Sequence, residues 1–115
     1  MKIGSIVIDC TEFNRMMTFW QEALYYVPRE SADDGWVVLR DPKGKSPNIS
    51  LNRVSEKTSS RNSLHLDLYT NDREGEVERL LKIGATVHPQ TYELDEDFRV
   101  LEDPEGNLFC IVQKT

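Results

Sequence analysis

The side chains best suited to chemistry stand close together in the stretch Ser63–Asp72. This stretch alternates polar and apolar residues, which predicts a half-buried strand running into the start of a helix. Successive side chains on a strand point to opposite faces, so His65 and Asp67 share the polar face. His65 is there either a neutral pocket histidine bonded to a neighbour or a contact for a ligand, a substrate or a metal. Asp67 could orient the imidazole or act as a base, or it is a solvated or paired carboxylate.

The remaining chemically interesting side chains are more isolated. Trp36 begins an apolar run and either walls a cavity or packs in a core or an interface. His88 stands at an expected strand end before Pro89, and we assign it no role. Cys10 and Cys110 are expected to be thiols that act as small buried hydrophobes in a reducing compartment.

Composition narrows the classes of protein to which this 115-residue chain can belong. Hydrophobic residues at 38% and charged residues at 30% indicate one soluble globular domain spanning 1–115. The 20 acidic against 14 basic residues argue against nucleic acid as a partner, and no apolar run is long enough for a membrane span. The start of the sequence lacks a signal-peptide pattern, so we expect a cytoplasmic location. No phosphate loop, nucleophile elbow, zinc cysteine pair or dinucleotide-binding fingerprint occurs in the sequence.

The first half of the chain predicts one helix and several strands. Apolar residues recur at three- and four-residue steps over 12–25, which is typical of a helix that packs one face in a core. Thr11 stands in the N-cap position of this helix, and Pro28 ends any continuation. The other expected elements are strands at 3–9, 36–40 and 48–52 and a turn at 41–44.

The second half repeats this order after a polar, serine-rich stretch at 54–62, which is the expected linker. Asn71–Asp72 is expected to cap a second helix, and Gly84 to end it. The other expected elements are the strand that begins at Ser63, strands at 85–88, 98–101 and 108–113, and a turn at 103–107.

The two halves therefore form a repeat of about 60 residues. The first turn begins 29 residues after Glu12, and the second begins 31 residues after Asp72. One such unit cannot bury its sheet face alone, so it pairs with its twin. This places module one at about 1–53 and module two at about 63–115.

Several short motifs follow one another along the chain at a regular spacing. They are Ile8–Cys10, Phe19–Trp20, Gly35–Pro42, Leu64–Leu68 and Asp103–Cys110. In this order and spacing they resemble the vicinal oxygen chelate superfamily, which includes glyoxalase I, bleomycin-resistance proteins and extradiol dioxygenases. The resemblance is to its glyoxalase-like domain branch and covers almost the whole chain. It implies an α+β fold of two tandem βαβββ modules that form a curved mixed sheet around a cavity, with helices on the outer face.

The resemblance also implies where a metal would bind. Enzymes of the superfamily place one ligand on the first and last strand of each module, and the equivalent positions here are Ser5, Ser50, His65 and Cys110. Asn48 or Asn52 could replace Ser50, since all three share one face of their strand. Serine hydroxyls are weak ligands, so this set is a degenerate metal site, and we expect no metal and no other cofactor. The expected ligand-binding residues are Ser5, Trp36, Ser50, Asn52, His65, Asp67 and Cys110.

The family pattern also has a Leu-Gly-aromatic sequence where this chain has Tyr25 and Tyr26. Without the glycine, the helix before them could extend or the cavity rim could change shape.

The function expected from this resemblance is binding of a small organic molecule, which the protein would sequester or sense as bleomycin-resistance proteins do. The alternative is a metal-assisted lyase or isomerase of the glyoxalase type, with His65 and Asp67 as the candidate catalytic residues and a divalent metal held partly by water. A regulatory or interaction module is a third reading, so whether the chain is an enzyme stays open. The resemblance further implies a homodimer.

Overall fold

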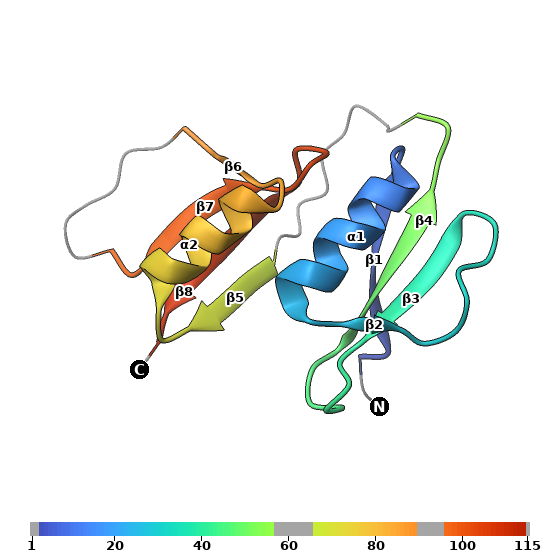
Figure 1. Ribbon diagram of the computed structural model, residues 1–115, viewed down its shortest axis with the longest axis horizontal. Helices are drawn as coiled ribbons and strands as arrows, with labels where there is room; N and C mark the ends of the chain where they lie inside the picture. Colours follow the sequence, from blue (N-terminus) through green and yellow to red (C-terminus); the bar gives the residue numbers. More distant parts are fainter. Residues whose placement is uncertain (1–2, 57–65, 90–95, 115) are drawn as a thin grey trace. The chain divides into compact units, whose positions relative to one another are not determined.

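The chain folds as two compact units, Met1–Ser59 and Ser60–Thr115, each built from one sheet and one helix (Figure 1). The structure, a computed structural model, describes residues 3–56, 66–89 and 96–114. Each unit has the order strand, helix and three strands, so the predicted α+β fold of two tandem βαβββ modules is confirmed. Within the described residues, no helix is long and apolar enough to cross a membrane.

Unit 1 contains a four-stranded mixed sheet in the order β1-β4-β3-β2. The first and last strands lie side by side in parallel, and the other neighbours are antiparallel. The predicted strand at 36–40 is confirmed to the residue, and the two-residue β2 is an addition to the strands named from the sequence. The elements are β1 (Ser5–Cys10), α1 (Phe13–Leu24), β2 (Val27–Pro28), β3 (Trp36–Arg40) and β4 (Asn48–Arg53).

Helix α1 packs its apolar stripe against one face of this sheet (Figure 1). The rings of Phe19 and Trp20 meet edge to face, with centroids 5.1 Å apart. Complete burial of each such large side chain contributes roughly 1.5–3 kcal/mol. We call the opposite side of the sheet the open face of unit 1. The core side chains are Phe13, Met16, Phe19, Trp20 and Ala23 on α1 and Val37, Leu39, Ile49 and Leu51 on the sheet.

The two ends of α1 differ from the sequence prediction. Glu12, and not Thr11, occupies the N-cap position, and its side chain makes no capping hydrogen bond. The prediction of Thr11 was wrong by one residue, because a cap is fixed by backbone angles that residue preference does not determine. At the other end Tyr25 takes the left-handed conformation, with φ of 58°, and its N–H donates to the carbonyl of Gln21. The helix therefore stops at Leu24, although no glycine is present to terminate it.

Unit 2 repeats the topology of unit 1, with strand order β5-β8-β7-β6 and parallel pairing of its first and last strands. The predicted strand that begins at Ser63 is described from Leu66 onward, and Ser63–His65 lie outside the described residues. The same holds for residues 57–62 of the predicted linker. The elements are β5 (Leu66–Thr70), α2 (Arg73–Lys82), β6 (Thr86–Val87), β7 (Phe98–Glu102) and β8 (Leu108–Gln113).

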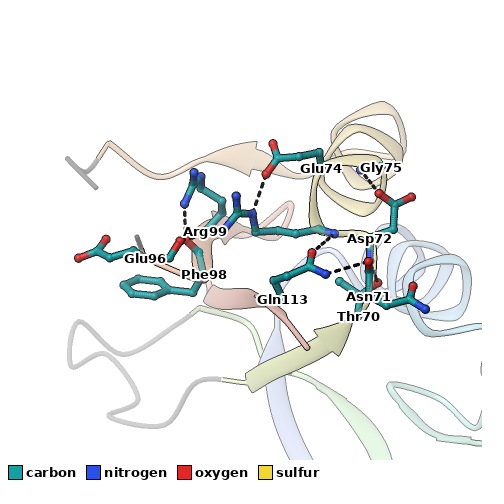
Figure 2. A network of polar contacts seen from close by, with 10 residues as sticks. Thr70, Asn71, Asp72, Glu74, Gly75, Glu96, Phe98, Arg99 and Gln113 are labelled. Carbon is teal, nitrogen blue, oxygen red and sulfur yellow. Dashed lines mark hydrogen bonds and ion pairs between the residues drawn. The ribbon is translucent and has the colours of Figure 1, made fainter. Parts of the chain in front are cut away.

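The start of α2 is anchored to the last strand of its own unit (Figure 2). Asp72 is the N-cap, as predicted, and its carboxylate accepts from the N–H of Gly75 at 3.2 Å. The Gln113 side chain accepts from the N–H of Arg73 and donates to the carbonyl of Asn71. Two backbone groups at the helix start are thus satisfied by one side chain of β8.

The two Asp-Pro turns are a second sign of the repeat. Asp41 accepts hydrogen bonds from the backbone amides of Lys43, Lys45 and Ser46, and these bonds, that from Lys43 above all, lower the pKa of its carboxyl group. Asp103 accepts in the same way from Glu105 and Asn107 and is buried. Both predicted turns are therefore confirmed, and in each one an aspartate orders the chain between the last two strands.

Candidate functional site

The candidate residues of unit 1 lie on its open face. Successive residues of a strand alternate between faces, so Ser5, Val7 and Asp9 project from β1 away from α1. Two positions on this face are apolar and well exposed: Val7 at 48% and Trp36 at 40%. This face thus combines polar groups with apolar surface that a ligand can cover.

Ser5 and Ser50 are in direct contact across β1 and β4. Their Oγ atoms are 2.5 Å apart, and Ser50 is fully buried. The comparison of the two halves of the sequence had placed both serines at metal-ligand positions, and the parallel pairing of the two strands brings them together. Each hydroxyl therefore has the other as its hydrogen-bond partner.

Asn52 continues the polar row toward Trp36. Its Nδ2 donates to Oδ1 of Asp9 at 3.2 Å, and its backbone is in register with Asp9 on one side and with Trp36 on the other. Asp9 was not among the residues predicted from sequence, although its alternation with Ser5 and Val7 would have placed it on this face. Two predicted ligand-binding residues, Asn52 and Trp36, are thus neighbours.

Trp36 also borders a shallow hollow of about 120 Å³ beside β3. The hollow carries charges of both signs, because Arg29, Glu30 and Asp33 line it together with Ser31. Trp36 forms an exposed wall here, so the alternative in which it packs fully into the core of its unit does not hold.

In unit 2 the sequence prediction centred on His65, which lies outside the described residues. Its predicted companions Asp67 and Cys110 are described, and they are in register on the adjacent strands β5 and β8. Burial, the charge of Asp67 and a hydrogen bond from the thiol to Asp67 all raise the pKa of Cys110, with burial the largest cause. Cys110 is therefore a thiol at neutral pH, and neither it nor Cys10 is in a disulfide. Cys10 is buried, as expected, whereas Cys110 is only half-buried.

A histidine–carboxylate pair on the same sheet was missed by the sequence analysis. Nδ1 of His88 lies 3.1 Å from Oε2 of Glu102, and both side chains are partly exposed, at 31% and 28%. The backbone N–H of His88 donates to the carbonyl of Val100, which is in register with Cys110. A row across the sheet thus runs from Asp67 through Cys110 and Val100 to His88. We call this side, which also carries Glu102 and Leu108, the open face of unit 2.

The sequence carries a signal for only one member of this pair. Alternation on β7 places Glu102 and Val100 on one face, but the position of His88 depends on the register of a two-residue strand. Within 3–56, 66–89 and 96–114, no three side chains of His, Cys, Asp or Glu are grouped so that they could hold a metal ion.

Comparison with known proteins identifies the family. A sequence model described as a glyoxalase-like domain matches residues 5–112. The chain belongs to the glyoxalase-like domain family. This confirms the resemblance read from the motifs, and the family match includes both units. The comparison with curated proteins gave no match.

Solved structures of the glyoxalase/bleomycin-resistance/dioxygenase class share the fold. A family enzyme from Burkholderia phytofirmans PsJN is 22% identical, with a TM-score of 0.77 over 96% of this chain and 97% of that one. A glyoxalase-related enzyme from Fulvimarina pelagi is 14% identical, with a TM-score of 0.75 over 97% and 87%. A mutant of the fosfomycin resistance protein FosX from Listeria monocytogenes, complexed with Mn(II) and 1S,2S-dihydroxypropylphosphonic acid, is 15% identical, with a TM-score of 0.77 over 99% and 90%. At these identities the likeness concerns the fold alone.

Proposed function

We propose that this glyoxalase-like protein binds a small organic molecule on the open faces of its sheets, without a complete set of metal ligands. The observation that carries the proposal is the hydrogen bond between Ser5 and Ser50. By the family resemblance these serines stand at two of the four expected metal-ligand positions, and hydroxyls are weak ligands for divalent ions. With its hydroxyl bonded to the buried Ser50, the partly exposed Ser5 offers a polar group to an organic ligand.

The state of Cys110 supports the same proposal. A cysteine binds a metal as the thiolate, so a metal at Cys110 would have to displace a proton that the surroundings hold by raising the thiol pKa. The thiol also donates a hydrogen bond to Asp67. Of the four expected ligand positions, only those of His65 and Cys110 carry side chains that commonly bind metals.

A metal-assisted lyase or isomerase is the second candidate function. The observation in its favour is that a solved FosX structure of this fold contains Mn(II) together with a phosphonic acid. In this chain such a centre would rely on His65 and on water molecules for most of its ligands.

Thermal unfolding in the presence of metal ions decides between the two functions. An ion that binds the native state raises the melting temperature, and above Kd the stabilisation grows with the logarithm of the ion concentration. We expect no rise with manganese, zinc, nickel or iron(II). A rise that His65→Ala abolishes and His88→Ala retains would overturn the proposal in favour of the metal-assisted enzyme.

Binding of the organic ligand can be followed through Trp36. The two tryptophans of the chain differ in environment, since Trp36 is partly exposed and Trp20 is buried. A ligand on the open face of unit 1 should change the fluorescence of Trp36, and Trp36→Phe should abolish the change. If no compound of a small-molecule library changes this fluorescence or the melting temperature, the binding proposal fails.

We also propose that the protein is a homodimer, and this proposal rests on the family resemblance. Light scattering after gel filtration should give twice the chain mass at all concentrations above the dimer Kd. A monomer mass at every concentration would refute the dimer.

A further inference from the structure

We propose that His88 and Glu102 form a second binding site on the open face of unit 2. The site takes a small molecule with an apolar body and one hydrogen-bond donor, which binds to the His88 ring. The proposal deepens the binding function above and rests on it. Glu102 lies on β7, next to the β8 strand of Cys110, and His88 lies one strand further out, after β6; neither residue is among the four predicted metal-ligand positions.

The contact with Glu102 fixes the proton on the imidazole. A carboxylate oxygen accepts hydrogen bonds, so Nδ1 of a neutral His88 carries the proton and donates it at 3.1 Å. Nε2 then keeps its lone pair and is an acceptor. Glu102 acts here as a positioning residue, because it sets both the tautomer and the orientation of the ring.

Apolar surface lies next to this acceptor. Leu108 is in register with Glu102 on the neighbouring strand and is partly exposed, whereas Val100, in register with Cys110, is buried and offers little surface. Neighbouring strands lie about 5 Å apart, so a ligand that binds Nε2 of His88 has to extend across β7, a further strand spacing, to reach Leu108. The body of the ligand would cover Leu108 while its donor meets Nε2.

The charges on this face select against anions. The carboxylates of Glu102 and Asp67 both lie on it, whereas Lys114 is placed over the ring of Tyr69 at the far strand β5. A hydroxyl or an ammonium group therefore suits Nε2, and a carboxylate is repelled. Neutral and cationic donors share this chemistry, and the experiment separates them.

The test is a titration of the full chain with four probes of similar size. Binding is measured from the changes in the backbone amide signals of Val100, Leu108 and Cys110 in NMR spectra. The probes are 4-methylphenol, benzylamine as its ammonium ion, benzoate and toluene. One hydrogen bond contributes a factor of about five to ten in affinity, so at least one donor probe should bind that much more tightly than toluene. Tighter binding of 4-methylphenol alone identifies a neutral ligand, and of benzylamine alone a cationic one.

Two controls show whether the gain in affinity comes from His88: substitution of the residue, and observation of which ring nitrogen carries the proton. His88→Phe should remove the gain over toluene, whereas Glu78→Gln, at an exposed position of α2, should keep it. Nitrogen-15 spectra of the His88 ring should show a protonated Nδ1 and an unprotonated Nε2, and Glu102→Gln should mix the two tautomers.

Three results would overturn this inference. They are a protonated Nε2 in the neutral wild-type ring, a gain that survives His88→Phe, or binding of benzoate as tight as that of the donors. If none of the four probes binds, this site fails, whereas the binding function fails only when the library screen through Trp36 is also negative.

Discussion

The hydrogen bond between Ser5 and Ser50 predicts an asymmetry between two single variants. Ser5→Ala leaves the fully buried Ser50 hydroxyl without its partner, which costs about 1–3 kcal/mol of unfolding free energy. Ser50→Ala leaves the hydroxyl of the partly exposed Ser5, which can turn to water, so the loss is about 0.5–1.5 kcal/mol. The double variant removes both partners, and its loss should fall below the sum of the single losses by about 1 kcal/mol.

Urea unfolding, monitored by tryptophan fluorescence, measures these losses of unfolding free energy. The signal reports on unit 1, which contains the two serines, because both tryptophans, Trp20 and Trp36, also lie there. With a urea dependence of about 1–3 kcal/mol per molar, Ser5→Ala should lower the midpoint by roughly 0.5–1 M. Ser55→Ala, at an exposed position of the same unit, is the control and should change the midpoint little. Equal losses in the two single variants, or losses that add in the double variant, would refute the idea that the serines are each other's partners.

Three further predictions concern the units separately. Tyr25→Gly should raise stability by about 0.5–1 kcal/mol in the same urea assay, because glycine accepts the left-handed conformation and the Tyr25 ring is exposed; a loss would show that the ring packs. Asp72→Ala should cost about 0.5–2 kcal/mol through loss of the α2 cap, measured by circular dichroism, while Asp34→Ala at a fully exposed site should cost little. The pKa of Cys110 is raised in the native state, which therefore favours the protonated thiol. The resulting contribution to the free energy of unfolding is complete below about pH 8.5, the ordinary thiol pKa, and is lost as the pH rises through the native pKa. The stability difference between wild type and Cys110→Ala should therefore shrink from pH 8 to pH 10, and a constant difference would contradict the raised pKa.

Much of the fold follows from the sequence because its signals are local. The β3 strand at Trp36–Arg40 and the β8 strand at Leu108–Gln113 were predicted to the residue, since a predicted turn follows the first strand at 41–44 and another precedes the second at 103–107. The cap at Asp72 was correct because a carboxylate there reaches Gly75. Thr11 failed as a cap because the neighbouring Glu12 takes the cap conformation without any side-chain bond.

The candidate site was less predictable because it depends on which strands are neighbours. The repeat placed Ser5 at the position equivalent to His65, and Ser50 at the position equivalent to Cys110. The contact between the two serines then followed from the pairing of β1 with β4. The pairing of His88 with Glu102 had no comparable signal, since a two-residue strand carries no alternation that would fix its register. The roles predicted for His65 stay predictions.

The parallel pairing of the first and last strands also governs how each unit can fold. Ser5 is in register with Asn48, so the hydrogen bonds of β1 form only after most of unit 1 has been synthesised. Pairings of such long sequence separation slow folding, because the entropy of closing the chain is lost before the contacts form. Every strand pairing of the described residues nevertheless stays within one unit. On a ribosome, unit 1 can therefore complete its sheet before the strands of unit 2 have emerged.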